Sequence, residues 1–209
     1  NITCGVPQGS ILGPLLFILY IPDIVRVSSL MKCILFADDT NLLLNDVNFN
    51  NLIINANTEI QKISEWLKIN KLSLNIKKTH FILFHFRQKE ISSKTSIKID
   101  NSELERVSST KFLGVILQEN LSWKLHISTL TSKINKNIGI LRALQQKLPI
   151  NVLLMLYNTL VYPYLQYCNI AWASQKDKYT DSLFVIKKRQ FGLFVKPTGV
   201  HTLHLCFTD

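Results

Sequence analysis

The chain has 209 residues, of which 47% are hydrophobic and 18% are charged. This composition excludes a chain too polar to fill a hydrophobic core, and the length allows one large domain or two small ones. The net charge of +10 favours polyanionic partners such as nucleic acids, although net charge alone is weak evidence. The sequence shows no signal peptide pattern.

The charges are unevenly distributed. Residues 1–46 contain two basic and four acidic side chains, whereas residues 62–98 contain nine basic and two acidic ones, a net charge of +7. No acidic residue lies between Glu119 and Asp177, a stretch that includes Lys124, Lys133, Lys136, Arg142 and Lys147. Two interpretations remain open: cation binding near the start with phosphate binding elsewhere, or a lysine-rich solvated surface.

The first half of the chain alternates predicted helices and strands. Ser10 predicts the N-cap of a helix that runs from Ile11 towards Val25. Residues 32–44 predict two strands that meet at Asp38-Asp39. Residues 52–67 predict an amphipathic helix, whose apolar face is formed by Ile53, Ala56, Ile60, Ile63 and Leu67. Residues 72–86 predict one strand or two, and residues 97–117 predict a hairpin that turns near Asp100-Asn101.

The second half is predicted to be helical. Residues 123–148 predict a long helix with an apolar stripe formed by Ile127, Leu130, Ile134, Leu141, Leu144 and Leu148. Pro149 ends it and a second apolar helix follows. Residues 149–175 carry no charge, but their Asn and Gln residues and the central Pro163 favour a buried amphipathic helix over a transmembrane one. A boundary is therefore expected near Asn120, with an α+β unit before it and a helical unit after it.

Asp38 and Asp39 are candidate metal ligands. Adjacent carboxylates repel each other, and a divalent cation such as Mg²⁺ relieves that repulsion while binding substrate phosphates. The competing interpretation is an ordinary acidic surface turn. A second pattern, His201-x-x-His204-x-Cys206, has loosely zinc-like spacing but lacks a fourth ligand nearby.

The segment Gly5-Val6-Pro7-Gln8-Gly9-Ser10 predicts a loop that leads into a helix. Gly5 and Gly9 allow the backbone to approach a sugar, base or phosphate closely, and Gln8 offers both a hydrogen-bond donor and an acceptor. A loop with no binding role is an equally valid interpretation of the hexapeptide alone.

Several blocks resemble reverse transcriptases, and more narrowly those of non-LTR (LINE, jockey-like) retrotransposons. Residues 5–17 resemble motif B, and Phe36-Ala37-Asp38-Asp39-Thr40 resembles the catalytic hairpin, motif C. Residues 66–79 are similar to the motif D region, and residues 111–127 are similar to the passage from palm to thumb. The first two motifs in this order are highly specific, whereas the later blocks are weak individually.

The resemblance implies an α+β fold: a partial polymerase palm over residues 1–120, an antiparallel sheet with helices on one face, then a helical thumb over 121–175 and its extension over 176–209. Its partners would be an RNA template, a DNA primer and deoxynucleoside triphosphates, in the nucleus, with no membrane. Asp38 would bind Mg²⁺, and Asp39 would support the site.

Other residues receive roles from the same resemblance. Gln8 and Gly9 would line the nucleotide and template, Phe36 would pack beneath the primer end, and Ala37 would be a small spacer. Lys78 would protonate the leaving pyrophosphate or simply be a solvated lysine. Lys133, Lys136 and Lys147 would contact duplex phosphates, whereas Trp66 and Trp123 are interpreted as packing residues rather than stacking platforms.

The family's motif A aspartate precedes motif B, and the printed sequence starts just before Gly5. We therefore expect this chain alone not to polymerise. The alternative function is a non-catalytic nucleic-acid-binding remnant of a decayed element. A third interpretation, an unrelated Mg²⁺-dependent hydrolase, would need a further acidic cluster.

Overall fold

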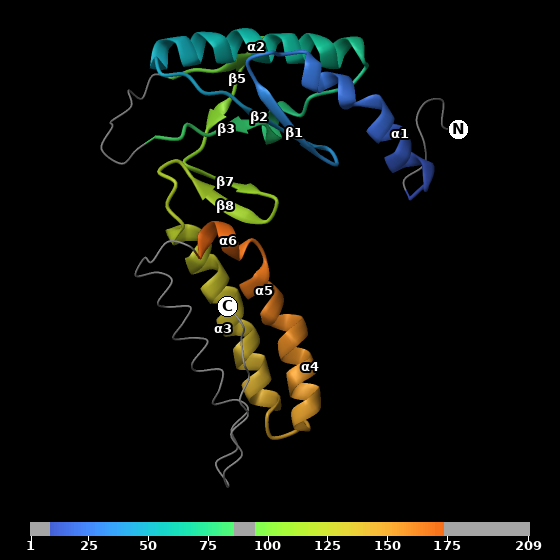
Figure 1. Cartoon of the computed structure of the whole chain (residues 1–209), viewed down its shortest axis with the longest axis vertical. Coiled ribbons are helices and arrows are strands. Elements are labelled where there is room, and N and C mark those ends of the chain that lie inside the picture. The colour runs from blue at the N-terminus through green and yellow to red at the C-terminus, as the bar shows by residue number, and fades with distance from the viewer. Residues whose placement is uncertain (1–8, 86–94, 174–209) are drawn as a thin grey trace. The chain divides into compact units, whose positions relative to one another are not determined.

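The computed structural model describes residues 9–85 and 95–173, which divide into two units (Figure 1). The first unit comprises the described residues up to Phe81 together with 95–107. The second comprises residues 82–85 and 108–173. The β7–β8 hairpin (Ser109–Phe112 and Val115–Gln118) thus belongs with the helices that follow it, on the C-terminal side of Val107. Identification of these units with a palm and a thumb remains a prediction.

The first unit is built around helix α2 (Phe49–Ile69). The side chain of Asn48 caps its N-terminus by accepting a hydrogen bond from the amide of Asn50 at 2.9 Å. The helix ends where Lys71 adopts a positive φ of 54° and the Leu72 amide donates to the Leu67 carbonyl, the Schellman arrangement. These local signals explain why the prediction for residues 52–67 is confirmed.

Helix α2 packs on two antiparallel hairpins (Figure 1). The hairpin β1–β2 (Lys32–Phe36 and Asp39–Leu43) contributes Cys33, Leu35 and Leu42 to a cluster around Ile63. The hairpin β4–β5 (Lys98–Ile99 and Ser102–Glu103) contributes Ile99 to a second cluster around Ala56. Because α2 is amphipathic, one of its faces covers both hairpins.

The remaining strands of this unit are short. In the described part of residues 72–86, which ends at residue 85, the predicted strand is reduced to β3 (His80–Phe81), preceded by the 3₁₀ turn η2 (Ile76–Lys78). Strand β3 pairs in parallel with β6 (Glu105–Arg106). The described residues form separate two-stranded sheets, and the single antiparallel palm sheet with helices on one face stays a prediction. The coarser prediction of a mixed fold with helices and short strands is confirmed.

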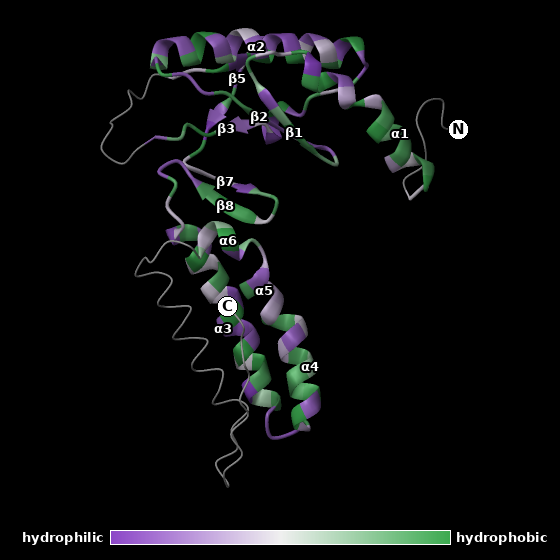
Figure 2. Ribbon diagram, in the orientation of Figure 1, coloured by the Kyte–Doolittle hydropathy of each residue, from purple (hydrophilic) through white to green (hydrophobic). Residues whose placement is uncertain are grey.

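Helix α1 (Leu12–Tyr20) is shorter than the helix predicted towards Val25, because the chain continues as the 3₁₀ helix η1 (Pro22–Arg26). Pro22 lacks an N–H and so cannot donate the next hydrogen bond of the α-helix, which therefore ends before it. Ile11 occupies the N-cap position, although Ser10 Oγ still accepts a hydrogen bond from the Leu12 amide at 3.3 Å. Helix α1 has no buried residue, and Figure 2 shows it as strongly apolar.

The second unit contains α3 (Lys124–Leu144), α4 (Ile150–Leu160), α5 (Tyr162–Gln166) and α6 (Asn169–Trp172). Its core includes Ile127, Leu130, Ile134, Ile138 and Leu141 of α3 together with Val161 and Trp172. Trp123 packs against this core and Trp66 packs in the first unit, which confirms the packing interpretation of both tryptophans. In the part of the chain that the structure describes, no helix is long and apolar enough to cross a membrane.

Candidate active site

The predicted catalytic residues lie at the turn of the β1–β2 hairpin. Phe36 and Asp39 are paired across the two strands, so Ala37 and Asp38 form a two-residue turn. Ala37 has a φ of 50°, and positive φ at the first central position alone is typical of a type II′ turn. Glycine usually occupies that position because a Cβ atom costs about 1 kcal/mol in left-handed backbone. The turn that carries Asp38 is therefore a strained one.

Both carboxylates are accessible to a ligand. Asp38 and Asp39 are exposed, and in the described part of the chain neither has a hydrogen-bond or ion-pair partner. Phe36, directly opposite Asp39, is 58% exposed. Two adjacent, unneutralised carboxylates beside an exposed aromatic ring form an acidic tip on the hairpin. Their oxygen atoms are the donors that a hard divalent cation such as Mg²⁺ prefers.

The base of this hairpin is anchored. Cys33 and Leu35 of β1 and Leu42 of β2 pack against the cluster formed by Ile21, Ile24 and Ile63. Burial raises the pKa of the Cys33 thiol, as expected for a group that gains no charged partner in an apolar environment. The turn is thus carried by a packed hairpin, which restricts where its carboxylates can move.

Gly9 is the described part of the predicted nucleotide-binding loop. Its φ is 85°, and a Cβ atom built there would meet nothing within 4 Å. The positive φ therefore favours glycine at this position, and crowding by a neighbour does not. Gln8 lies outside the described residues, as do the candidate zinc ligands His201, His204 and Cys206.

Lys78, the predicted proton donor, is exposed at the end of η2. The segment is held locally: the Lys78 amide donates to the Asn75 carbonyl at 3.0 Å, and the Thr79 hydroxyl donates to the same carbonyl at 2.9 Å. Lys78 and the Asp38 turn belong to the same unit, and the role of the lysine remains a prediction.

The second unit carries exposed basic side chains on α3. Lys133, Lys136 and Arg142 are exposed on this helix, and Lys147 is exposed just after it. The Lys133 Nζ atom lies 5.8 Å from the centre of the Tyr164 ring, a cation–π contact. These cations are available to phosphates, the role that the resemblance implies for Lys133, Lys136 and Lys147.

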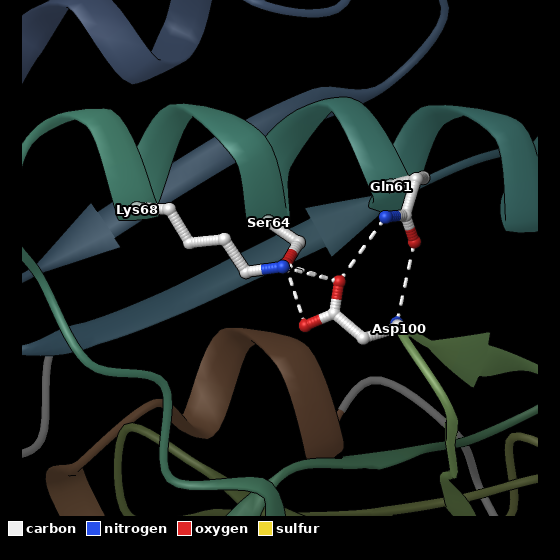
Figure 3. Close-up of polar contacts among 4 residues, drawn as sticks. All are labelled: Gln61, Ser64, Lys68 and Asp100. Carbon is white, nitrogen blue, oxygen red and sulfur yellow. Dashed lines mark hydrogen bonds and ion pairs between the residues drawn. The ribbon is translucent and has the colours of Figure 1, made fainter.

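A polar network around Asp100 was not foreseen from the sequence. Figure 3 shows Gln61, Ser64 and Lys68, all on α2, directed at the Asp100 carboxylate. Lys68 Nζ lies 2.6 Å from Oδ1, Gln61 Nε2 donates to the same oxygen at 3.1 Å, and the Ser64 hydroxyl lies 3.2 Å from both oxygens. The Lys68 ammonium, followed by Gln61, lowers the pKa of Asp100. The Asp-Asn dipeptide predicted the turn, but only the fold brings it to Lys68.

A second carboxylate with polar partners, and a buried one, belongs to Glu59 on α2. It is 3% exposed, and its Oε1 accepts a hydrogen bond from Lys62 Nζ at 2.6 Å. The Lys62 ammonium and, less strongly, the Ser28 hydroxyl lower the pKa of Glu59. Among residues 9–85 and 95–173, no three His, Cys, Asp or Glu side chains cluster closely enough to hold a metal ion.

Comparisons with known proteins agree with these observations. A model of the reverse transcriptase (RNA-dependent DNA polymerase) family matches residues 1–117. That match covers more than half of the chain and includes the carboxylate turn. The chain therefore belongs to the reverse transcriptase family.

Its relatives are polymerases of mobile elements. The chain is 26% identical over 96% of its length to a probable RNA-directed DNA polymerase from transposon X-element of Drosophila melanogaster. It is 27% identical over 79% of its length to the RNA-directed DNA polymerase from mobile element jockey of Drosophila funebris. It is 30% identical over 66% of its length to a probable RNA-directed DNA polymerase from transposon BS of Drosophila melanogaster. The resemblance to jockey-like reverse transcriptases is confirmed.

The matched regions are small parts of these relatives. The chain spans 23% of the X-element polymerase, 19% of the jockey polymerase and 16% of the BS polymerase. No solved structure matches the chain.

Proposed function

We propose that this chain supplies the metal-binding turn and the duplex-holding helices of an RNA-directed DNA polymerase. The reaction adds a deoxynucleotide to a DNA 3′-OH along an RNA template and releases pyrophosphate. The observation that carries the proposal is the β1–β2 turn, where two exposed, unpaired carboxylates follow a strained Ala37. Strained backbone conformations cluster at active sites and ligand-binding sites, where they contribute to the geometry of the site.

Within this proposal, Asp38 holds the divalent cation, which is Mg²⁺, and Asp39 adds negative charge that favours its binding. The cation would polarise the phosphate that is attacked and stabilise the charge of the leaving pyrophosphate. Phe36 packs beneath the primer end, Ala37 leaves room for it, and Gln8 and Gly9 line the nucleotide and template. Lys78 protonates the leaving pyrophosphate.

The exposed basic groups of the second unit support the nucleic-acid part of the proposal. Lys133 and Lys136 lie one helical turn apart on α3, so both can contact phosphates of one backbone. Such contacts release counterions, and binding should weaken as salt is raised. This surface also supports the second candidate, a binding remnant, because phosphate binding by α3 does not require the carboxylate turn.

The first experiment is to read the coding sequence that flanks this chain and to assay primer extension by the polypeptide it encodes. Asp38→Asn should reduce Mg²⁺-dependent extension at least about a hundredfold, while affinity for the primer–template should stay within about twofold. Asp23→Asn is the matched control, because Asp23 is an exposed acidic residue of η1, outside the hairpin. Equal activity of the two variants would refute the role of Asp38.

The same assay separates the two functions. A parent polypeptide with salt-dependent duplex binding but no extension at any Mg²⁺ concentration would favour the binding remnant. Extension by the wild type that is lost in Asp38→Asn would favour the polymerase.

A further inference from the structure

The turn of the β7–β8 hairpin has demanding backbone geometry. Phe112 and Val115 are paired across the strands, so Leu113 and Gly114 form a two-residue turn. Their φ values are 45° and 87°, and positive φ at both central residues is typical of a type I′ turn. Asn and Gly are favoured at such positions, whereas leucine is strained there. Something outside the turn must hold Leu113 in place.

Tyr167 makes the contacts that hold it. The Tyr167 hydroxyl donates a hydrogen bond to the Leu113 carbonyl at 2.5 Å, across 54 residues of sequence. The ring also lies on Gly114: a Cβ atom added there would be 3.3 Å from Tyr167 Cε1. That separation is tighter than an ordinary van der Waals contact, so Gly114 is required both by its backbone and by the tyrosine ring.

Tyr167 is itself fixed to the helices. It ends α5, where its amide donates to the Pro163 carbonyl at 3.0 Å. Its own carbonyl accepts a hydrogen bond from Trp172 Nε1 at 2.9 Å, and Trp172 is only 4% exposed. The hydroxyl that reaches the turn is therefore carried by a residue that is itself 54% exposed but whose carbonyl is bonded to Trp172 of the core.

The hairpin is attached to α3 at other points as well. The Ile116 amide donates to His126 Nδ1 at 3.3 Å, and Gln118 Oε1 accepts a hydrogen bond from the Leu125 amide at 2.9 Å. The first contact holds β8 near the turn and the second holds its far end, whereas Tyr167 holds the turn itself. Three separated attachments prevent the hairpin from rotating on the helices.

We propose that Tyr167 is a positioning residue that locks the β7–β8 hairpin to the helices, so that cations on both elements bind one nucleic-acid backbone together. The exposed Lys111 on β7 then acts in concert with Lys133 and Lys136 on α3. This inference rests on the proposed function, since it concerns how the duplex is held. Loss of the hydroxyl loosens the turn beside Lys111 and weakens its coupling to the helical lysines, although Ile116, the strand partner of Lys111, stays bonded to His126.

The attachment of the turn by Tyr167 is tested first without nucleic acid, by amide hydrogen exchange in this chain. Tyr167→Phe should speed exchange of β7 and β8 amides beside the turn by about five- to tenfold, the effect of losing one hydrogen bond. The control is Tyr162→Phe on the same helix, because the Tyr162 hydroxyl makes no hydrogen bond within the described ranges. Equal exchange rates in the two variants would refute the proposal that Tyr167 holds the turn. Gly114→Ala, which crowds the tyrosine ring and also strains the turn at a φ of 87°, should speed the same exchange.

The effect of Tyr167 on duplex binding by Lys111 is then measured with a fluorescein-labelled RNA–DNA hybrid duplex. The association constant for the duplex falls as salt is raised, and the steepness of this fall on a log–log plot counts the phosphate contacts. In the wild-type background, Lys111→Ala should reduce that steepness by about one. In the Tyr167→Phe background the same substitution should reduce the slope by clearly less than one, since Lys111 is then held less firmly beside the helical lysines. Additive effects of the two substitutions would refute the concerted role, and Tyr162→Phe should leave the Lys111 effect intact.

The two proposals fail differently. A wild-type chain that does not bind the hybrid at low salt would refute duplex binding and the concerted role of Lys111, whereas the exchange rates would still decide whether Tyr167 locks the turn. A chain that binds the hybrid, with unchanged exchange and additive salt slopes in Tyr167→Phe, would refute this inference and leave the proposed function standing.

Discussion

The Nδ1 atom of His126 accepts a hydrogen bond from the backbone amide of Ile116 at 3.3 Å, so the ring is neutral with its proton on Nε2. His126 is 2% exposed, lies edge-on to Trp123 and Trp172, and its Nε2 has no partner in the described part of the chain. Burial, and then the nearby charge of Lys133, lower the pKa of His126 below its ordinary value of 6.5.

This shift predicts acid sensitivity. Above pH 6.5, both the folded and the unfolded chain carry neutral His126, and its titration does not affect stability. Below that pH the unfolded chain binds the proton first, so the free energy of unfolding should fall until the lower folded pKa is reached. Urea denaturation from pH 7.5 to pH 5 measures this loss. His126→Gln, which retains an acceptor for Ile116, should flatten the profile; an unchanged profile would contradict the assignment.

Substitution at Ala37 should report the strain in the β1–β2 turn. Ala37→Val places a β-branched side chain at a φ of 50°, and should destabilise the chain by about 1–2 kcal/mol. Ala37→Gly removes the steric cost but adds freedom to the unfolded chain, so its stability should lie within about 1 kcal/mol of wild type. Urea denaturation distinguishes them, and equal midpoints for the two variants would show that the positive φ is not maintained.

Substitution of Asp100 should destabilise the chain in two ways, through loss of its charge and through the strain of its positive φ. Its φ of 52° suits Asp and Asn but not Ala. Asp100→Asn loses the ion pair with Lys68 but can still accept hydrogen bonds from Gln61 and Ser64, whereas Asp100→Ala loses all of them. The melting temperature should fall in the order wild type, Asn, Ala, with the Ala variant several degrees below the Asn variant. The reverse order would exclude the Asp100 carboxylate as a stabilising link between α2 and β4–β5.

The core of the second unit should depend on Ile134. Its side chain is 0% exposed, whereas Ile140 on the same helix is 51% exposed. Ile134→Ala should cost about 2–5 kcal/mol through lost burial and a residual cavity, and Ile140→Ala should change stability by less than about 0.5 kcal/mol. Denaturation curves of the two variants test this directly, and similar midpoints would mean that α3 does not pack as described.

Helix α1 should make the chain self-associate. Ile18 and Leu19 are 66% and 71% exposed, and other apolar side chains of α1 are exposed beside them. An apolar surface of this extent favours association in water. Light scattering should show a particle size that grows with concentration, and Ile18→Lys combined with Leu19→Lys should reduce that growth. Val47→Lys is the control, since Val47 is fully exposed but lies in a loop; equal effects would exclude α1 as the cause.

The features that the sequence determined are those governed by near neighbours along the chain. The periodic spacing of Ala56, Ile63 and Leu67 predicted helix α2 and its buried face, because residues three or four apart lie on one side of a helix. Asp38 was predicted at a turn between two strands, and the structure shows that turn. The motif order also identified the family, whereas the catalytic role of each residue is still a proposal.

Only the tertiary structure decided the contacts between distant residues. Lys68 meets Asp100 across 32 residues and Tyr167 meets Leu113 across 54, and nothing in the local pattern of either segment specifies its partner. The alternation in residues 72–86 likewise predicted more strand than forms in the described part of this segment, because a strand needs a partner and only His80 and Phe81 among residues 72–85 meet one in β6. Local periodicity determines which face of an element is apolar; which element covers that face, and which polar groups then meet, depends on how the whole chain packs.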